Sequence, residues 1–215
     1  MKIIIPARLG SKGLPFKNRT LFKYTADSIP LDRRSDVIVT TDDPEIIKLA
    51  QEYAFTIVER PAILAEDDTS TRDVLFHVIK EQNIASSEFI IMLYLTYPER
   101  TWEEVMDAFN FFLEHSYSGA ATSLLCKKEV KTHPYLCLEE YGTDGIFGRQ
   151  ITRHDLYRRQ DYPKCFEISH YISIFKAGAI YKLNRNLYCD TTVFYKIDDV
   201  IDVDTEKELT QFNGK

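Results

Sequence analysis

The first eighteen residues combine a short apolar strand with a loop that is rich in glycine and positive charge. Residues 2–6 read Lys-Ile-Ile-Ile-Pro, a β-branched run typical of a buried strand. Cations, small residues and one amide follow it: Arg8, Gly10, Ser11, Lys12, Gly13, Lys17 and Asn18. A loop of this composition can turn backbone N–H groups toward an anion while its cations supply charge. The pattern predicts a phosphate-binding loop, with a basic surface loop as the alternative.

A strand, a turn and a helix are predicted twice within the first part of the chain. Residues 36–41 form a second apolar strand, after which Asp43 can cap a helix with Pro44 at its first position. A strand end and a helix cap explain Asp42 and Asp43 sufficiently, so neither is assigned to catalysis. Further strands are expected over 56–58, 89–95 and 119–125. This alternation predicts an α/β fold with a mainly parallel sheet flanked by helices.

Capping residues mark three later helix starts. The spacing of a capping box, a threonine followed three residues later by glutamate, occurs at Thr101–Glu104 and Thr205–Glu208. A cluster of threonine and serine at 69–71 can cap another helix. Residues 19–30, in contrast, are polar and short, and no bounds are assigned to the helix of the first strand–turn–helix unit.

The length of 215 residues suits a single domain spanning residues 1–215. Within it, residues 127–175 are rich in Tyr, His, Arg and Lys and have few helical periods. Strands are expected there over 135–138 and 171–174, joined through a turn at 141–145. The histidines of this region lack metal-ligand spacing: His133, His154 and His170. We interpret residues 127–175 as a small β-rich inserted lobe and a candidate subunit contact.

The composition argues against several classes of protein. A net charge of −6 argues against a general nucleic-acid binder, whereas local groups of cations suit a small anionic ligand. The four cysteines are widely spaced and form no Cys-x-x-Cys pair, so neither a zinc site nor a disulfide framework is expected. Neither a signal peptide nor an apolar run of membrane-spanning length is recognised. We therefore expect a soluble, cytoplasmic protein without a nucleic-acid or membrane partner.

Two carboxylates alternate with apolar residues near the carboxyl end of the chain. Residues 200–204 read Val-Ile-Asp-Val-Asp, so Asp202 and Asp204 would project from the same face of a strand. Paired carboxylates of this kind make a hard-oxygen site that suits Mg²⁺. The alternative is a capped helix with Asp204 as the N-cap, which accounts for one aspartate but not for both.

The order Pro-Ala-Arg-x-Gly-Ser-Lys-Gly-x-Pro-x-Lys-Asn at residues 6–18 resembles the amino-terminal signature of the CMP-sialic acid synthetase (acylneuraminate cytidylyltransferase) family. Further segments resemble that family in the same order along the chain: 37–43, 60–67, 93–101, 158–163 and 201–205. The resemblance covers most of the chain. It implies a nucleotidyltransferase domain, Rossmann-like or GT-A-like, with a small inserted lobe.

The resemblance also implies roles for particular residues. Arg8, Lys12 and Lys17 would hold phosphates and serve catalysis, within a nucleotide-binding set that comprises Ala7, Arg8, Gly10, Ser11, Lys12, Gly13, Lys17, Asn18, Arg60 and Thr71. Arg60 and Thr71 would contact the cytosine base, Thr71 by register only, with a plain helix-start residue as its alternative. Arg159 would meet the carboxylate of the sugar. Asp202 and Asp204 would hold Mg²⁺.

The chain departs from the family at positions on the sugar side. Tyr94 stands where the family has a glutamine that touches the sugar, and a phenol cannot make the hydrogen bonds of an amide. Ser169 and His170 stand within a segment where the family tends to read Asn-Gly-Ala-Ile-Tyr. These departures affect the acceptor sugar more than the reaction.

The function implied by the resemblance is the transfer of CMP from CTP to an acidic 2-keto sugar, with release of pyrophosphate. A nonulosonic acid of the sialic acid type is the first choice of sugar, and a 3-deoxy-octulosonate is an alternative. A non-catalytic nucleotide-binding relative of the family is a second alternative, from another class. The family is usually dimeric, so a homodimer is expected.

Overall fold

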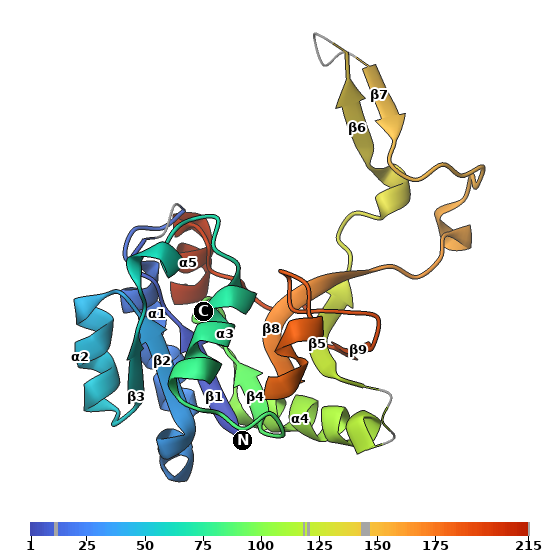
Figure 1. Cartoon of the computed structure of the whole chain (residues 1–215). Helices are drawn as coiled ribbons and strands as arrows, with labels where there is room; N and C mark the ends of the chain where they lie inside the picture. Colours follow the sequence, from blue (N-terminus) through green and yellow to red (C-terminus); the bar gives the residue numbers. More distant parts are fainter. Residues whose placement is uncertain (11–12, 118, 120, 143–146, 215) are drawn as a thin grey trace.

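A seven-stranded sheet forms the centre of the molecule, with strand order β3-β2-β1-β4-β8-β5-β9. The computed structural model describes residues 1–10, 13–117, 119, 121–142 and 147–214 (Figure 1). The strands of the sheet are β1 (Lys2–Pro6), β2 (Val37–Thr41), β3 (Thr56–Glu59), β4 (Phe89–Met92), β5 (Ser123–Glu129), β8 (Phe166–Lys176) and β9 (Thr192–Lys196). All neighbouring pairs are parallel except those of β8, which runs antiparallel to β4 and β5.

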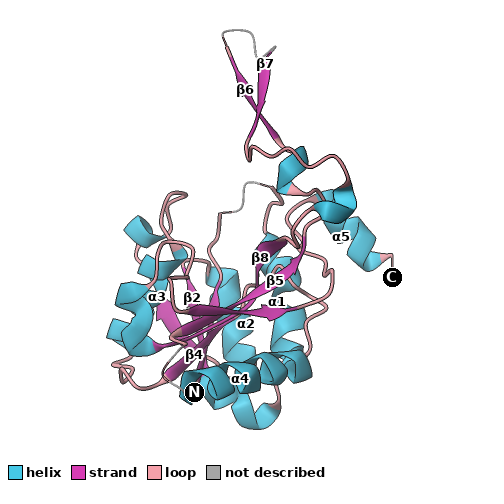
Figure 2. Cartoon of the chain, turned by 90° about the vertical axis from the view of Figure 1, so that its right-hand side faces the viewer, coloured by secondary structure: helices cyan, strands magenta, loops and turns pink. Residues whose placement is uncertain are grey.

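Helices cover both faces of this sheet, as Figures 1 and 2 show. They are α1 (Lys17–Ser28), α2 (Pro44–Glu52), α3 (Thr71–Glu81), α4 (Trp102–Tyr117) and α5 (Glu206–Asn213). Buried residues of α1, α2 and α4 pack in one core with Ile3 and Ile5 of β1, whereas those of α3 pack in a second core with Ile4. The predicted α/β fold with a mainly parallel sheet flanked by helices is therefore confirmed.

The predicted helix starts are confirmed, because each depends on a side chain close in the sequence. The Asp43 carboxylate accepts from the Glu45 N–H at the start of α2, and the Ser70 hydroxyl accepts from the Asp73 N–H at the start of α3. Glu104 accepts from both the N–H and the hydroxyl of Thr101. Among the described residues, no helix has the length and apolar character needed to cross a membrane.

Helix α1 is the helix of the first strand–turn–helix unit, whose bounds the sequence analysis did not predict. Leu21, Phe22 and Ala26 of α1 are buried in the core, although the rest of the segment is mostly polar. Residues four positions apart share a helix face, as Leu21 does with Thr25 and Phe22 with Ala26, so this small buried group is enough to dock the helix on the sheet.

Three predicted strands differ from the structure. Strand β4 ends at Met92, three residues before the predicted end at 95. Strand β5 starts at Ser123 rather than 119 and continues to Glu129. The segment expected as a strand over 135–138 instead contains a 3-10 turn, η3 (Pro134–Leu136), whose first position is a proline and whose start is capped by the His133 ring. Residues 171–174 are a strand, as predicted, within β8.

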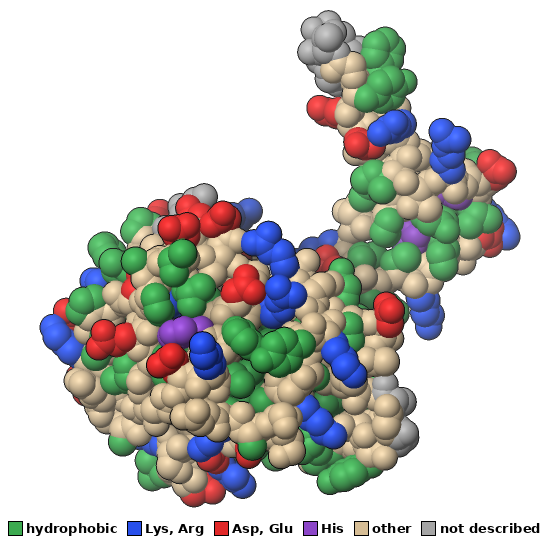
Figure 3. All heavy atoms as spheres, viewed as in Figure 1, with side chains coloured by type: hydrophobic (Ala, Val, Ile, Leu, Met, Phe, Trp, Pro, Cys, Tyr) green, Lys and Arg blue, Asp and Glu red, His purple; other side chains and the backbone are tan. Residues whose placement is uncertain are grey.

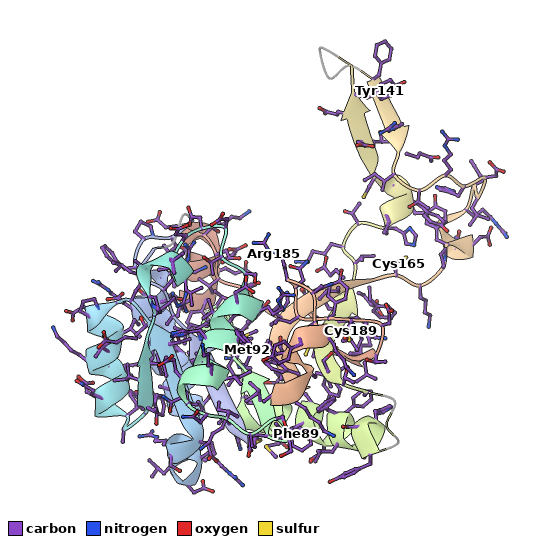
Figure 4. All side chains as sticks on the ribbon, viewed as in Figure 1. Phe89, Met92, Tyr141, Cys165, Arg185 and Cys189 are labelled. Atoms are coloured by element: carbon purple, nitrogen blue, oxygen red, sulfur yellow. The ribbon has the colours of Figure 1, made fainter. Side chains whose placement is uncertain are left out.

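Residues 130–165, here called the arm, project away from the body of the molecule (Figures 1 and 2). The arm contains η3, an antiparallel hairpin of β6 (Leu138–Tyr141) and β7 (Phe147–Gln150), and the 3-10 turn η4 (Arg159–Asp161). In Figure 4, Tyr141 lies at the outer end of the arm, remote from Met92 in the central sheet. The flanking parts of the lobe defined over 127–175 belong to β5 and β8 of the sheet.

Candidate functional site

A pocket opens where β1, β3 and β4 end, which is the usual ligand site of an open α/β sheet. The predicted site residues that line it are Arg8, Gly10, Lys17, Asn18, Arg60, Thr71 and Tyr94. Residues far apart in the sequence therefore meet in one cavity. Glu66, Asp67 and Thr96 also line it and were not assigned to the site from the sequence.

The loop after β1 is held in place by backbone contacts on both sides. The Ala7 N–H donates to the Thr40 carbonyl at 3.0 Å, which extends the pairing of β1 with β2, and the Ala7 side chain lies in the core. The Leu9 N–H donates to the Asp42 carboxylate at 2.8 Å, and the Asn18 amide donates to the Arg8 carbonyl at 2.8 Å. Asn18 and Asp42 thus shape this loop. Ser11 and Lys12 lie outside the described residues.

Gly13 lies directly against the segment that carries the two aspartates. A Cβ atom added at Gly13 would lie 2.4 Å from the Asp204 carbonyl oxygen, closer than real Cβ atoms come to any heavy atom. Only glycine permits this approach of one backbone to another. The glycine-rich loop at the amino end and the aspartates at the carboxyl end therefore form one site.

Both described cations of the loop pair with carboxylates across the pocket. Arg8 Nη1 lies 2.6 Å from Asp67 Oδ1, and the ammonium of Lys17 pairs with Asp204. The Arg8 and Asp67 side chains are 30% and 50% exposed, so their ion pair is weak. A polyanionic ligand could replace these carboxylates as the partner of both cations.

Arg60 brings a buried positive charge to the pocket wall. Its Nη2 donates to the Thr40 carbonyl at 3.0 Å, while its buried Nε has no hydrogen-bond partner among the described residues. Burial lowers the pKa of Arg60 to about 10, although the nearby Asp42 charge opposes this shift. An electron-rich group of a ligand would satisfy this partly desolvated guanidinium.

Thr71 and Tyr94 link the two sides of the pocket. Thr71 is the first residue of α3, and its hydroxyl hydrogen-bonds the Tyr94 hydroxyl. The Tyr94 ring meets the His170 ring edge to face, with centroids 5.9 Å apart, and burial raises the pKa of Tyr94. The position where the family has an amide is therefore filled by an aromatic wall.

The Asp202–Asp204 segment is not a strand, contrary to the prediction. Its one ladder-like bond in the described structure runs from the Val203 N–H to the Thr96 carbonyl at 2.8 Å. Val203 is fully buried in the core, so the alternation that motivated the prediction is retained. The helix-cap alternative for Asp204 is wrong, because Thr205 is the N-cap of α5 and completes the capping box with Glu208.

The two aspartates differ in their surroundings. Asp202 Oδ2 accepts a hydrogen bond from the Tyr97 hydroxyl at 2.8 Å, whereas its buried Oδ1 has no partner at hydrogen-bond distance among the described residues. Burial raises the pKa of Asp202, and the charge of Asp204 raises it further, against the opposing effects of the Tyr97 hydrogen bond and the nearby Thr96 hydroxyl. Asp204 is mostly exposed.

This pair fits a cation that is bound together with a phosphate ligand. An unpaired, buried carboxylate oxygen is a natural metal ligand. Within the described ranges, no three His, Cys, Asp or Glu side chains gather as a metal site. Mg²⁺ is usually held by one or two carboxylates, with phosphate oxygens and waters completing its coordination. The magnesium site stays a prediction.

Arg159 lies on the arm, in η4, and does not line the pocket described here. Its neighbour Arg158 pairs with Asp161 at 2.9 Å. In the single chain, Arg159 does not reach the pocket, and its sugar-binding role stays a prediction.

Fold and pocket together define an α/β protein with a basic pocket at the carboxyl ends of its strands, and comparisons with known proteins narrow this class. A family model described as cytidylyltransferase matches residues 2–94. The chain is 24% identical over 201 residues to the N-acylneuraminate cytidylyltransferase of Streptococcus agalactiae, covering 89% of this chain and 45% of that protein. It is 26% identical to the pseudaminic acid cytidylyltransferase of Campylobacter jejuni, covering 98% and 96%. The chain is thus similar to cytidylyltransferases, which confirms the resemblance inferred from the motifs.

Solved structures support the fold. A CMP:2-keto-3-deoxy-manno-octonic acid synthetase complexed with CTP superposes with a TM-score of 0.68, at 14% identity, covering 99% of this chain and 96% of that chain. At this identity the likeness shows the fold alone. The chain spans just under half the length of the streptococcal relatives it matches, and most of the length of the Campylobacter relative.

Proposed function

We propose that this chain is a CTP-dependent cytidylyltransferase that activates an acidic 2-keto sugar of the nonulosonic type. The observation that carries the proposal is the convergence of the glycine-rich basic loop and Arg60 on one pocket, with the Asp202–Asp204 segment held against the same loop at Gly13 and Lys17. Relatives named for sialic, pseudaminic and N,N'-diacetyllegionaminic acid support this class of sugar.

In the proposed reaction the anomeric hydroxyl of the sugar attacks the α-phosphorus of CTP. The new O–P bond forms as the bond to the β-phosphate oxygen breaks, pyrophosphate leaves, and the hydroxyl proton is lost. Such transfers depend mostly on positioning and on neutralising phosphate charge. Among the residues that the structure describes, none stands out as the general base.

The chain's own residues would divide these tasks. Arg8, Lys12 and Lys17 would hold the triphosphate, with Arg8 and Lys17 leaving their carboxylate partners Asp67 and Asp204. Arg60 and Thr71 would face the cytosine. Asp202 and Asp204 would hold Mg²⁺, which when bound would neutralise phosphate charge. Tyr94 would form the wall on the sugar side.

We also propose that two copies of the chain associate through the arm. Large apolar side chains of the arm are exposed in the single chain: Leu138 is 63%, Phe147 61% and Ile151 64% exposed. Figure 3 shows hydrophobic side chains along the visible face of the arm. A surface of this kind usually marks an interaction site. Association would also give Arg159 a route to a partner's pocket, and light scattering tests it directly.

The test of the function is pyrophosphate release, measured with each of the four nucleoside triphosphates against a panel of acidic sugars. We expect release with CTP and a nonulosonic acid. Release with a 3-deoxy-octulosonate alone would favour that alternative sugar. CTP binding without release on any sugar would favour the non-catalytic relative, and equal affinity for a purine triphosphate would contradict the cytidylyltransferase proposal.

A further inference from the structure

The two oxygens of the Asp202 carboxylate are used differently. Oδ2 accepts a 2.8 Å hydrogen bond from Tyr97, while Oδ1 is buried without a hydrogen-bond partner among the described residues. Buried polar atoms are nearly always paired, so an unpaired oxygen on the segment that packs against the glycine-rich loop indicates a partner from outside the chain. Because the Tyr97 hydroxyl donates to Oδ2, Oδ1 is the oxygen that remains without a hydrogen bond.

Tyr97 is held rigidly by its surroundings. Its side chain is only 5% exposed, and its ring meets the Tyr171 ring edge to face, with centroids 5.3 Å apart and planes at 88°. The Tyr171 hydroxyl is in turn fixed by a 2.8 Å hydrogen bond to Glu104. Arg100 holds the backbone on both sides of these rings, because it donates to the carbonyls of Tyr94 and Tyr171 at 2.9 and 2.8 Å.

We propose that Tyr97 is a positioning residue that fixes the Asp202 carboxylate and leaves Oδ1 free for the divalent cation. The proposal rests on the magnesium site of the proposed function. A carboxylate with one oxygen engaged binds a cation through the other oxygen alone, as suits the compact octahedral coordination of Mg²⁺. Hydrogen-bond partners that orient a metal ligand commonly change metal affinity 10- to 100-fold.

Tyr97→Phe tests this proposal, because it removes the hydroxyl and keeps the ring that packs on Tyr171. Tyr53→Phe is a matched control. It also removes a hydroxyl that donates to an aspartate, here Asp27 at 2.6 Å, at a site that does not line the pocket. Mn²⁺ serves as the probe, and its binding is measured by electron paramagnetic resonance with CTP present and no sugar, so that no turnover occurs. CTP affinity in EDTA is measured by calorimetry.

In Tyr97→Phe we expect Mn²⁺ affinity to fall by about 10- to 100-fold, with CTP affinity in EDTA unchanged. Tyr53→Phe should lower Tm and keep the Mn²⁺ affinity of the wild type. Unchanged Mn²⁺ affinity in folded Tyr97→Phe would overturn the positioning role. If both Asp202→Asn and Asp204→Asn also bind Mn²⁺ as the wild type does, the metal site of the proposed function fails instead.

A double variant keeps the proposal testable if Tyr97→Phe does not fold. Tyr97→Phe combined with Asp202→Asn leaves a neutral amide in place of an unpaired carboxylate, and an amide costs less to bury. If Tyr97 acts through Asp202, the double variant and Asp202→Asn should bind Mn²⁺ equally. A further tenfold loss in the double variant would show that Tyr97 acts by another route.

Discussion

Gly13→Ala is the sharpest perturbation of the contact between the two ends of the chain. The added Cβ would meet the Asp204 carbonyl oxygen at 2.4 Å, so the two backbones must separate by at least 0.6 Å to reach the 3.0 Å that real Cβ atoms respect. Both partners are backbone, and no side-chain rotation can relieve the contact. Overpacking of this kind costs about 1–3 kcal/mol.

The expected consequence is a loss of both stability and activity. For a domain of this size, about 1–3 kcal/mol lowers Tm by roughly 2–12 °C. The same separation moves the phosphate-binding loop away from Asp204. Since a 1 Å displacement can cost about a hundredfold in rate, we expect kcat/KM for pyrophosphate release to fall roughly 10- to 100-fold. Differential scanning fluorimetry and a coupled pyrophosphate assay measure the two effects.

Gly10→Ala is the matched control in the same loop. Its added Cβ would meet only the flexible end of Arg8, at 4.0 Å, so its Tm should change little. The reasoning fails if Gly13→Ala keeps the Tm and turnover of the wild type. Equal damage from both substitutions would show that the loop needs glycine for reasons other than the approach to Asp204.

Three further predictions concern charged residues. Lys12→Ala should reduce kcat/KM by an amount equivalent to about 2–4 kcal/mol of lost transition-state stabilisation, and should leave Tm unchanged. Turnover at the wild-type rate would remove Lys12 from the mechanism. Asp202→Asn and Asp204→Asn should each leave Tm unchanged or raise it in metal-free buffer while strongly reducing pyrophosphate release; near-wild-type release in excess Mg²⁺ would contradict the metal site. Burial raises the pKa of Asp43, but the Arg19 and backbone hydrogen bonds outweigh this and lower the pKa. The ionised Asp43 carboxylate therefore stabilises the fold at pH values above the ordinary carboxyl pKa, and this stabilisation is lost as the pH falls through the lowered pKa. Asp43→Asn should lower the urea midpoint at pH 7, and the midpoints of the variant and the wild type should converge in acid.

The class of fold could be predicted from the sequence because its signals are local. The apolar run of β1 and the Asp43–Pro44 helix start each involve residues a few positions apart, and their physical chemistry is the same in any tertiary setting. The same holds for the capping boxes at Thr101–Glu104 and Thr205–Glu208. The bounds of helix α1 could not be found in this way, because the helix is mostly polar and is held by a few apolar residues that pack against the sheet.

The sequence by itself determined as candidates the glycine-rich loop, the aspartate pair and seven of the fifteen residues that line the pocket. Only the tertiary structure decided their partners. Tyr97 meets Asp202 from 105 positions away, and Gly13 meets Asp204 because the ends of the chain come together beside β1 and β4. Arg159 was placed on the arm rather than in the pocket. Contacts between distant segments depend on strand order and on the packing of whole elements, and no short-range pattern in the sequence encodes them.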